Sequence, residues 1–275
     1  MFDIFVEMFS YAFLARAVIV GLLVSICASL LGVSLVLKRY SMIGDGLSHT
    51  GFGSLAIASA LNLAPLLVSI PIVVLSAFVL LRVSENSKIK GDASIALMST
   101  SAMAIGVIVI SMTKGLTIDV CNYLFGSILA MTIMDVYLSI VLSFIVIILF
   151  IVFYNKIFAV TFDENFARAT GVKAGFYNML IAVLTAVTIT LGMRMMGALL
   201  ISSLIIFPAL TSMRLCKTFK SVIISSAIIS IVCFFMGVVI SYVYASPTGA
   251  SIVIVNIFMF AAFCLAALLK RRKTI

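Results

Sequence analysis

The sequence contains very little charge and almost no histidine. Only 10% of its 275 residues are Asp, Glu, Lys or Arg, a single histidine is present, and 64% of the residues are hydrophobic. Soluble domains are about one quarter charged and about half apolar, so this composition excludes a soluble globular fold. It predicts an integral membrane protein whose solvent is lipid.

Several chemical motifs are also absent. The chain has no P-loop, no HExxH motif and no Ser–His–Asp set, which disfavours an ATPase or an intramembrane enzyme. The five cysteines form no CxxC pair and are interpreted as small packing residues. The N-terminus carries Asp3 and Glu7 and no positively charged region, which is not typical of a cleaved signal peptide.

Nine apolar runs approach the length of about 20 residues that a membrane-spanning helix needs. They cover residues 17–37, 43–61, 65–81, 93–112, 134–154, 176–192, 197–215, 221–244 and 250–269. The second run is the weakest, because several glycines, Asp45 and His49 fall in its first half. We therefore predict an all-α bundle of eight or nine transmembrane helices forming one domain over residues 1–275. The short apolar stretch 120–131 is predicted to be re-entrant or interfacial.

The net charge of +9 is distributed unevenly along the chain. Most basic residues fall in alternate connections, whereas the other connections hold only Arg16, Lys114 and Arg194. By the positive-inside rule, the basic connections and the C-terminus face the cytoplasm. No basic stripe with interleaved aromatics exists, so nucleic-acid binding is not expected. The longest cytoplasmic connection, 155–175, is too short for an ATPase domain, so energy must come from a partner or an ion gradient.

The second run contains the strongest candidate site. Asp45 and His49 are four residues apart, so on a helix their side chains lie on one face, one turn apart. A carboxylate and an imidazole in this arrangement can bind one divalent cation, and ionisable groups within spans are usually functional. Two other interpretations stay open: Asp45 could be the N-cap of this helix, or the pair could relay protons.

Residues 163–172 form the second candidate, predicted as a short amphipathic cytoplasmic helix with acidic residues at its start and Gly171 at its end. Such a helix could dock a cytoplasmic partner or merely link two spans, and the residues alone favour neither. Near position 200, Met193, Met195 and Met196 are interpreted as packing residues, and Pro208 is predicted to kink a span. Small residues such as Gly32 and Gly237 are expected to allow close helix packing.

The stretches 37–49, 162–172, 197–209 and 246–250 together resemble, in order, motifs of the membrane permeases of ATP-binding cassette importers for zinc, manganese and iron. The similarity runs nearly end to end. One departure is Gly46, where that family commonly has alanine, and the glycine is expected to loosen this helix turn.

This resemblance implies a fold similar to that of the vitamin B12 importer permease and a function in importing divalent metal by alternating access. It implies a homodimer in the bacterial cytoplasmic membrane, two separate ATPase subunits, an extracytoplasmic metal-binding protein and no permanently bound cofactor. Asp45 and His49 are then the metal contacts. The ATPase-coupling residues implied by the resemblance are Asp163, Glu164, Phe166, Ala167, Arg168, Ala169 and Gly171.

Two alternative functions are weighed against this one. A permease for a metal chelate or siderophore would leave Asp45 and His49 with a structural role. An ion-coupled secondary carrier would work without an ATPase, but it would be expected to have more carboxylates within the membrane than Asp45.

Overall fold

The computed structural model describes residues 12–86, 91–113 and 132–272, and every regular element in these ranges is a helix. The helices are α2 (Ala12–Leu37), α3 (Ile43–Ala60), α4 (Pro65–Asn86), α5 (Gly91–Met112), α7 (Ile133–Val152), α8 (Tyr154–Phe162), α9 (Glu164–Ala169), α10 (Ala174–Met196), α11 (Ala198–Met213), α12 (Phe219–Tyr244) and α13 (Thr248–Arg272). The predicted all-α class is confirmed. The predicted re-entrant stretch 120–131 lies outside the described residues.

Each of the nine predicted apolar runs forms a helix. Seven of these helices are long and apolar enough to cross a membrane, namely α2, α4, α5, α7, α10, α12 and α13. The other two, α3 and α11, have only 18 and 16 residues. At about 1.5 Å per residue they span about 27 and 24 Å, slightly less than the hydrocarbon core of about 30 Å. The chain is thus a polytopic bundle with about seven to nine spans.

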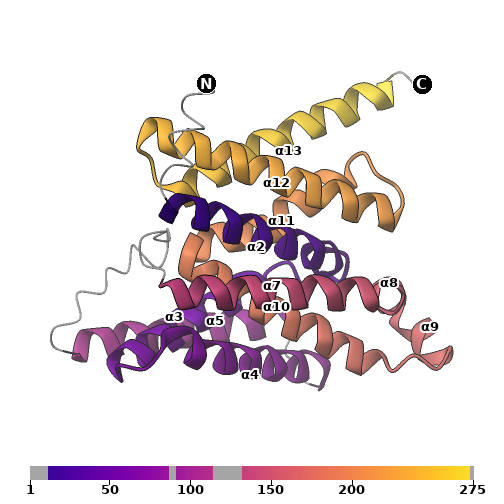
Figure 1. The fold of residues 1–275 in the computed structure, drawn as a ribbon. Coiled ribbons are helices and arrows are strands. Elements are labelled where there is room, and N and C mark those ends of the chain that lie inside the picture. The colour runs from indigo at the N-terminus through magenta and orange to yellow at the C-terminus, as the bar shows by residue number, and fades with distance from the viewer. Residues whose placement is uncertain (1–11, 87–90, 114–131, 273–275) are drawn as a thin grey trace.

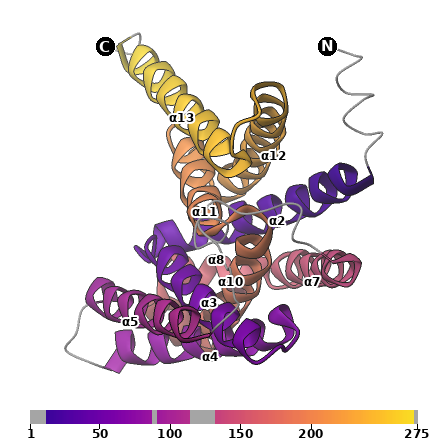
Figure 2. The ribbon, with the colours of Figure 1, turned by 90° about the vertical axis from the view of Figure 1, so that its left-hand side faces the viewer.

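The helices run back and forth along one direction, and α2 crosses the middle of the bundle between two groups (Figures 1 and 2). Helices α12 and α13 lie on one side of α2, and α3, α4 and α5 lie on the other (Figure 2). The short helices α8 and α9 lie at the same end as the C-terminal end of α13 (Figure 1). This common end fits the prediction that the connection 155–175 and the C-terminus face the same side.

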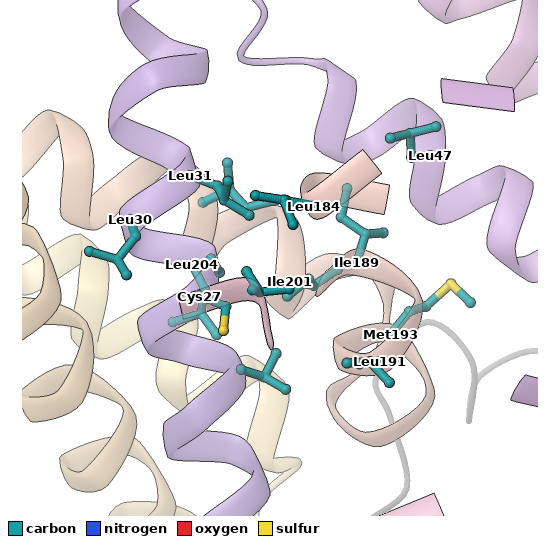
Figure 3. Close-up of a cluster of buried hydrophobic side chains, with 14 of the residues drawn as sticks. Cys27, Leu30, Leu31, Leu47, Leu184, Ile189, Leu191, Met193, Ile201 and Leu204 are labelled. Carbon is teal, nitrogen blue, oxygen red and sulfur yellow. The ribbon is translucent and has the colours of Figure 1, made fainter. Parts of the chain in front are cut away.

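The apolar core lies where α2, α10 and α11 meet (Figure 3). Leu31 of α2, Ile189 of α10 and Leu204 of α11 are almost completely buried there. In contrast, few residues of α5 and α13 are buried inside the chain, so their apolar side chains face the surroundings. Cys27 and Cys233 are buried among apolar neighbours, as predicted.

Local sequence signals set several helix ends. Thr132 and Thr218 each form a capping box with the residue three positions later, which satisfies free N–H groups at the starts of α7 and α12. Helices α10 and α11 are separated only by Gly197, whose φ of 85° is unfavourable for other residues. These two helices are therefore joined without a loop.

Gly32 of α2 allows the backbones of α2 and α11 to touch. A Cβ atom on Gly32 would lie 2.0 Å from the carbonyl oxygen of Ile205 in α11. Real Cβ atoms do not approach a backbone oxygen so closely, so the two helices would have to separate. Gly237 has the same role between α12 and α13, where a Cβ atom would lie 2.5 Å from Cα of Ile252. The prediction that small residues permit close helix packing is confirmed at both positions.

We expect Gly32→Ala to destabilise the bundle by about 3 kcal/mol, because overpacking against fixed backbone costs about 1–3 kcal/mol. Gly175→Ala is the matched control, since Gly175 lies in α10 with no atom within 4 Å of the added methyl. Thermal unfolding of both variants in detergent checks this prediction. Equal melting temperatures for the two variants would contradict the close contact between α2 and α11.

Candidate metal site and coupling helix

Asp45 and His49 lie together on α3, one helical turn apart. His49 Nε2 is 3.6 Å from Asp45 Oδ1, which is slightly too long for a hydrogen bond. The Asp45 side chain is 47% exposed and the His49 side chain 18% exposed, although α3 lies among apolar helices. The shared face predicted from the spacing is confirmed, while the role of this pair as metal ligands stays a prediction.

The N-cap interpretation of Asp45 is wrong. Helix α3 begins at Ile43, and its N-cap residue is Met42, which makes no side-chain capping bond. Asp45 is therefore inside the first turn, where a negative charge is favourable because the N-terminal end of the helix dipole is positive. A carboxylate that does not cap the backbone is available for another partner.

The other faces of α3 are covered by neighbouring helices. A Cβ atom on Gly46 would lie 2.6 Å from Ile95 Cγ2, and one on Gly53 would lie 2.6 Å from the carbonyl oxygen of Ala102. Both neighbours belong to α5, so α3 and α5 pack closely along their lengths. In this chain a glycine at position 46 makes room for Ile95, and the expected loosening of this helix turn stays a prediction.

On the side facing α11, a Cβ atom on Gly44 would lie 3.8 Å from Ser202 Oγ. This Ser202 hydroxyl is buried and makes no hydrogen bond within the described part of the chain. Met193 packs beside Gly51 from another direction and is fully buried, as Figure 3 also shows. Its packing role was predicted; the side chain of Met195 lies outside the described atoms.

Asp45 and His49 do not form a closed metal site. Among the described residues, no group of three or more His, Cys, Asp or Glu side chains could hold a metal ion. A structural zinc site uses four protein ligands. An ion at this pair would complete its coordination with water, other oxygen atoms or a second copy of the chain, and could therefore leave again.

The predicted amphipathic helix at 163–172 is present as α9. Asp163 caps it, since its carboxylate accepts a hydrogen bond of 2.9 Å from the backbone N–H of Phe166. Gly171, with a φ of 82°, ends it, and the N–H of Val172 turns back to the carbonyl of Ala167. These local signals explain why a helix of only six residues forms between α8 and α10.

Helix α9 has one buried residue and an exposed outer surface. Ala167 is fully buried in a small apolar cluster with Val160 and Ala174, which fixes α9 to α8 and α10. The Phe166 side chain is 64% exposed, and Arg168 and Ala169 are also exposed. Figure 1 shows α9 at the extreme end of the bundle. An exposed phenylalanine and arginine on a fixed helix are available to a partner, but docking itself stays a prediction.

Glu164, the first residue of α9, joins this helix to two other segments. Its Oε2 accepts a hydrogen bond of 3.0 Å from Asn178 Nδ2 of α10 and lies 3.7 Å from the ammonium of Lys38, which follows α2. Its Oε1 is paired with Arg168. Burial raises the pKa of Glu164, but the hydrogen bonds from Asn178 and Arg168 and the charges of Lys38 and Arg168 outweigh burial, so its pKa lies below the ordinary value.

A second ion pair lies at the opposite end of the bundle. Arg194, near the end of α10, donates a hydrogen bond of 2.9 Å to Asp135 Oδ1 in α7, and both side chains are nearly buried. The other carboxylate oxygen of Asp135 accepts from the N–H and hydroxyl of Thr132. Arg194 is thus neutralised within the chain.

The sequence did not predict that Asn178 binds Lys38 and Glu164. It also did not predict that Asp135 pairs with Arg194. Asn178 is a lone amide in an apolar run, and Asp135 stands three residues after Thr132 at the start of another run. Both were visible as polar residues within predicted spans. Only the fold shows that Asn178 meets Lys38 and Glu164, since these residues are far apart in sequence.

The fold is that of a helical membrane protein with Asp45 and His49 on one face of α3 and a short exposed helix, α9, at one end of the bundle. The chain belongs to the ABC 3 transport family, which it matches over residues 10–267. It is accordingly the membrane permease of an ATP-binding cassette transporter and a multi-pass membrane protein. ATP hydrolysis takes place on a separate subunit, and such permeases work with ATPase and binding-protein partners.

Two relatives are similar over almost the whole chain. The manganese import system permease protein ScaB of Streptococcus gordonii is 29% identical over 250 residues, which is 91% of this chain and 90% of the relative. The high-affinity zinc uptake system membrane protein ZnuB of Haemophilus influenzae is 28% identical over 250 residues, which is 91% of this chain and 96% of the relative.

Two solved structures share the fold. A chain of PsaBC from Streptococcus pneumoniae, solved in complex with Fab, has a TM-score of 0.84 and 29% identity, covering 95% of this chain and 94% of that chain. A putative metal-chelate type ABC transporter in an inward-facing conformation has a TM-score of 0.75 and 14% identity, covering 92% of this chain and 86% of that chain. The second similarity shows a fold shared with a putative metal-chelate type ABC transporter, while the predicted likeness to the vitamin B12 importer permease stays a prediction.

The Glu164 pairing generates a pH prediction. Because the pKa of Glu164 is lower in the folded chain than its ordinary value of 4.5, its ionised form adds stability above that pH, and this contribution is lost as the pH falls through the lowered pKa. We expect the melting temperature of the wild type to exceed that of Glu164→Gln at neutral pH, and the difference to vanish in acid. A difference independent of pH would contradict the ionised pairing.

The ion pair between Arg194 and Asp135 generates a second prediction. Asp135→Asn is expected to destabilise the bundle by about 3 kcal/mol, since breaking a buried ion pair leaves the Arg194 charge uncompensated. The double variant Asp135→Asn/Arg194→Met should recover part of the loss, because it removes both charges. Thermal unfolding of the wild type, Asp135→Asn, Arg194→Met and the double variant measures the coupling, and strictly additive losses would argue against the pair.

Proposed function

We propose that the chain moves divalent metal ions, zinc or manganese and possibly iron, into the cytoplasm by alternating access. Asp45 and His49 contact the ion during its passage, and separate ATPase subunits supply the energy. The single observation that carries this proposal is the pairing of these two side chains on one face of α3, with His49 Nε2 3.6 Å from Asp45 Oδ1.

The separation between the two side chains fits one shared ion. Zinc bonds nitrogen and oxygen ligands at about 2.0–2.2 Å, so two such atoms at a tetrahedral angle lie about 3.4 Å apart. The observed 3.6 Å between His49 Nε2 and Asp45 Oδ1 therefore needs almost no rearrangement. An ionised carboxylate in a low-dielectric region attracts a divalent cation strongly, and an imidazole nitrogen adds a directional ligand.

The choice of metal stays open at these two residues, because a carboxylate and an imidazole suit zinc, manganese and ferrous iron. The relatives ScaB and ZnuB are named as parts of a manganese import and a zinc uptake system. The names support a small divalent cargo for this chain. Family membership argues against a secondary carrier without an ATPase.

The remaining parts of the proposal concern partners and orientation. Two copies of the chain form the permease, an extracytoplasmic metal-binding protein delivers the ion, and α9 docks against the ATPase. The C-terminus and α9 face the cytoplasm of a bacterial cell, which the shared end in Figure 1 and the basic connections support. The ion is cargo, and no permanently bound cofactor is proposed.

Uptake of radiolabelled zinc and manganese in cells tests the site. We expect Asp45→Ala and His49→Ala each to lower uptake at least about tenfold at equal expression, since even an outer-shell metal partner is worth about 10–100-fold. Asp45→Asn, which keeps the shape and removes the charge, should show the same loss, and metal content of the purified complex should fall with it.

Thr100→Ala is the matched control, because Thr100 is an exposed residue of neighbouring α5 whose hydroxyl bonds only to carbonyls of its own helix. Uptake should be unchanged in this variant. Undiminished metal uptake in Asp45→Ala would reject the site. Uptake that requires a chelator in the wild type would favour a metal-chelate permease, in which the two residues are structural.

A further inference from the structure

Three polar side chains from three separate segments meet at the end of the bundle where α9 lies. Lys38 follows α2, Glu164 begins α9, and Asn178 lies in the second turn of α10. Asn178 accepts a hydrogen bond from Lys38 and donates one of 3.0 Å to Glu164. The Lys38 ammonium also lies 3.7 Å from the Glu164 carboxylate, which closes a triangle of contacts.

The amide of Asn178 fits this position in only one orientation. Its Oδ1 faces the ammonium and its Nδ2 faces the carboxylate, so turning the amide over would place like partners together. The residue is only 7% exposed. Because both halves of the amide are used, Asn178 holds Lys38 and Glu164 at a fixed separation.

The charges of the triangle depend on each other. The Lys38 side chain is 11% exposed, so its ammonium has lost most of its hydration, and Glu164 is the carboxylate beside it. Removing a partner from a largely buried charge is costly, because the remaining charge stays desolvated. The low pKa of Glu164 keeps the carboxylate ionised at physiological pH.

Lys38 is connected to the helix that carries Asp45 through a tight turn. The N–H of Tyr40 bonds to the carbonyl of Leu35 at 2.9 Å, and the N–H of Ile43 bonds to the carbonyl of Tyr40 at 3.0 Å. Arg39, within this turn, has a left-handed φ of 63°. Only residues 38–42 connect α2 to α3. A displacement of Lys38 is therefore expected to move the start of α3.

A small cavity lies between the Lys38–Asn178–Glu164 triangle and the start of α3. Its volume is about 60 Å³, and its walls include Lys38, Glu164, Asn178 and the first residue of α3, Ile43. Ile43 is two residues before Asp45. The coupling helix and the start of the metal-carrying helix therefore border the same space.

We propose that Lys38, Asn178 and Glu164 are positioning residues that transmit movement of α9 to the first turn of α3 and so to Asp45. The inference rests on the proposed function, because it assumes that an ATPase moves α9. None of the three residues is part of the Asp45–His49 pair. When α9 shifts, the ion pair and the amide carry Lys38 with it, and the turn that follows Lys38 moves the start of α3.

The test uses the permease assembled with its ATPase subunits in liposomes. In Lys38→Met, ATP hydrolysis should stay within about twofold of the wild type. In both Lys38→Met and Glu164→Gln, the number of ions moved per ATP hydrolysed should fall at least about fivefold, the lower end of ordinary coupling factors. The exchange Lys38→Glu/Glu164→Lys should restore at least half of the ratio, because Asn178 can turn its amide over to serve the exchanged charges.

Lys156→Met is the matched control, since it removes an exposed positive charge from the neighbouring helix α8. Its ratio of transport to hydrolysis should equal that of the wild type. An unchanged ratio in Glu164→Gln would overturn the proposal. So would a parallel loss of hydrolysis and transport, which indicates a role in assembly alone, or an exchange variant as uncoupled as the single variants.

A second measurement separates this inference from the proposed function. Met42, the exposed N-cap residue of α3, is replaced by cysteine in a chain whose own cysteines are changed to serine. ATP with vanadate should change the maleimide labelling rate of Met42→Cys, and Glu164→Gln should abolish this change. Asp45→Ala should retain it. Complexes that transport no metal would refute the proposed function, and the labelling would still test the transmission.

Discussion

A bilayer offers no hydrogen bonds, and this constraint governs the structure. Ser226 and Ser230 of α12 donate to backbone carbonyls of α2, and other hydroxyls in the spans, such as those of Thr185 and Thr188, donate to carbonyls of their own helix. Asp135 and Arg194 neutralise each other. Against this background the carboxylate of Asp45 is distinctive, because it is half-exposed and its neighbouring ionisable group is the imidazole of His49 on the same helix.

The constraint also explains why the two functional regions differ in construction. Helix α3 is held on its other faces by close contacts with α5, α10 and α11, so the Asp45–His49 face is the one left open. Helix α9 is held by a single buried alanine and one carboxylate, Glu164, and its outer surface stays free. Helix α3 is therefore packed against several helices, whereas α9 is attached to the bundle through few residues.

Much of this fold could be read from the sequence, because lipid permits few solutions. The nine apolar runs predicted the positions of nine helices, and the basic connections predicted which end of the bundle faces the cytoplasm. The i, i+4 spacing of Asp45 and His49 placed both side chains on one face once α3 formed. Asp163 and Gly171 signalled the ends of α9 through known capping chemistry.

Contacts between distant segments could not be read in the same way. The meeting of Lys38, Glu164 and Asn178 depends on how α2, α9 and α10 cross, which no local pattern encodes. The N-cap role of Asp45 was plausible from spacing, but tertiary packing starts α3 at Ile43 instead. The close contact between Ile95 of α5 and Gly46 was also not predictable, because it depends on how α3 and α5 cross.

The junction at Gly197 has a mechanical consequence. Helices α10 and α11 share this one residue, and a residue has only two soft backbone dihedral angles. No flexible loop lies between the two helices. A rotation of α10 is therefore passed directly to α11. Ser202 of α11 lies beside Gly44, so a rotation of α10 also displaces the side of α3 that faces α11.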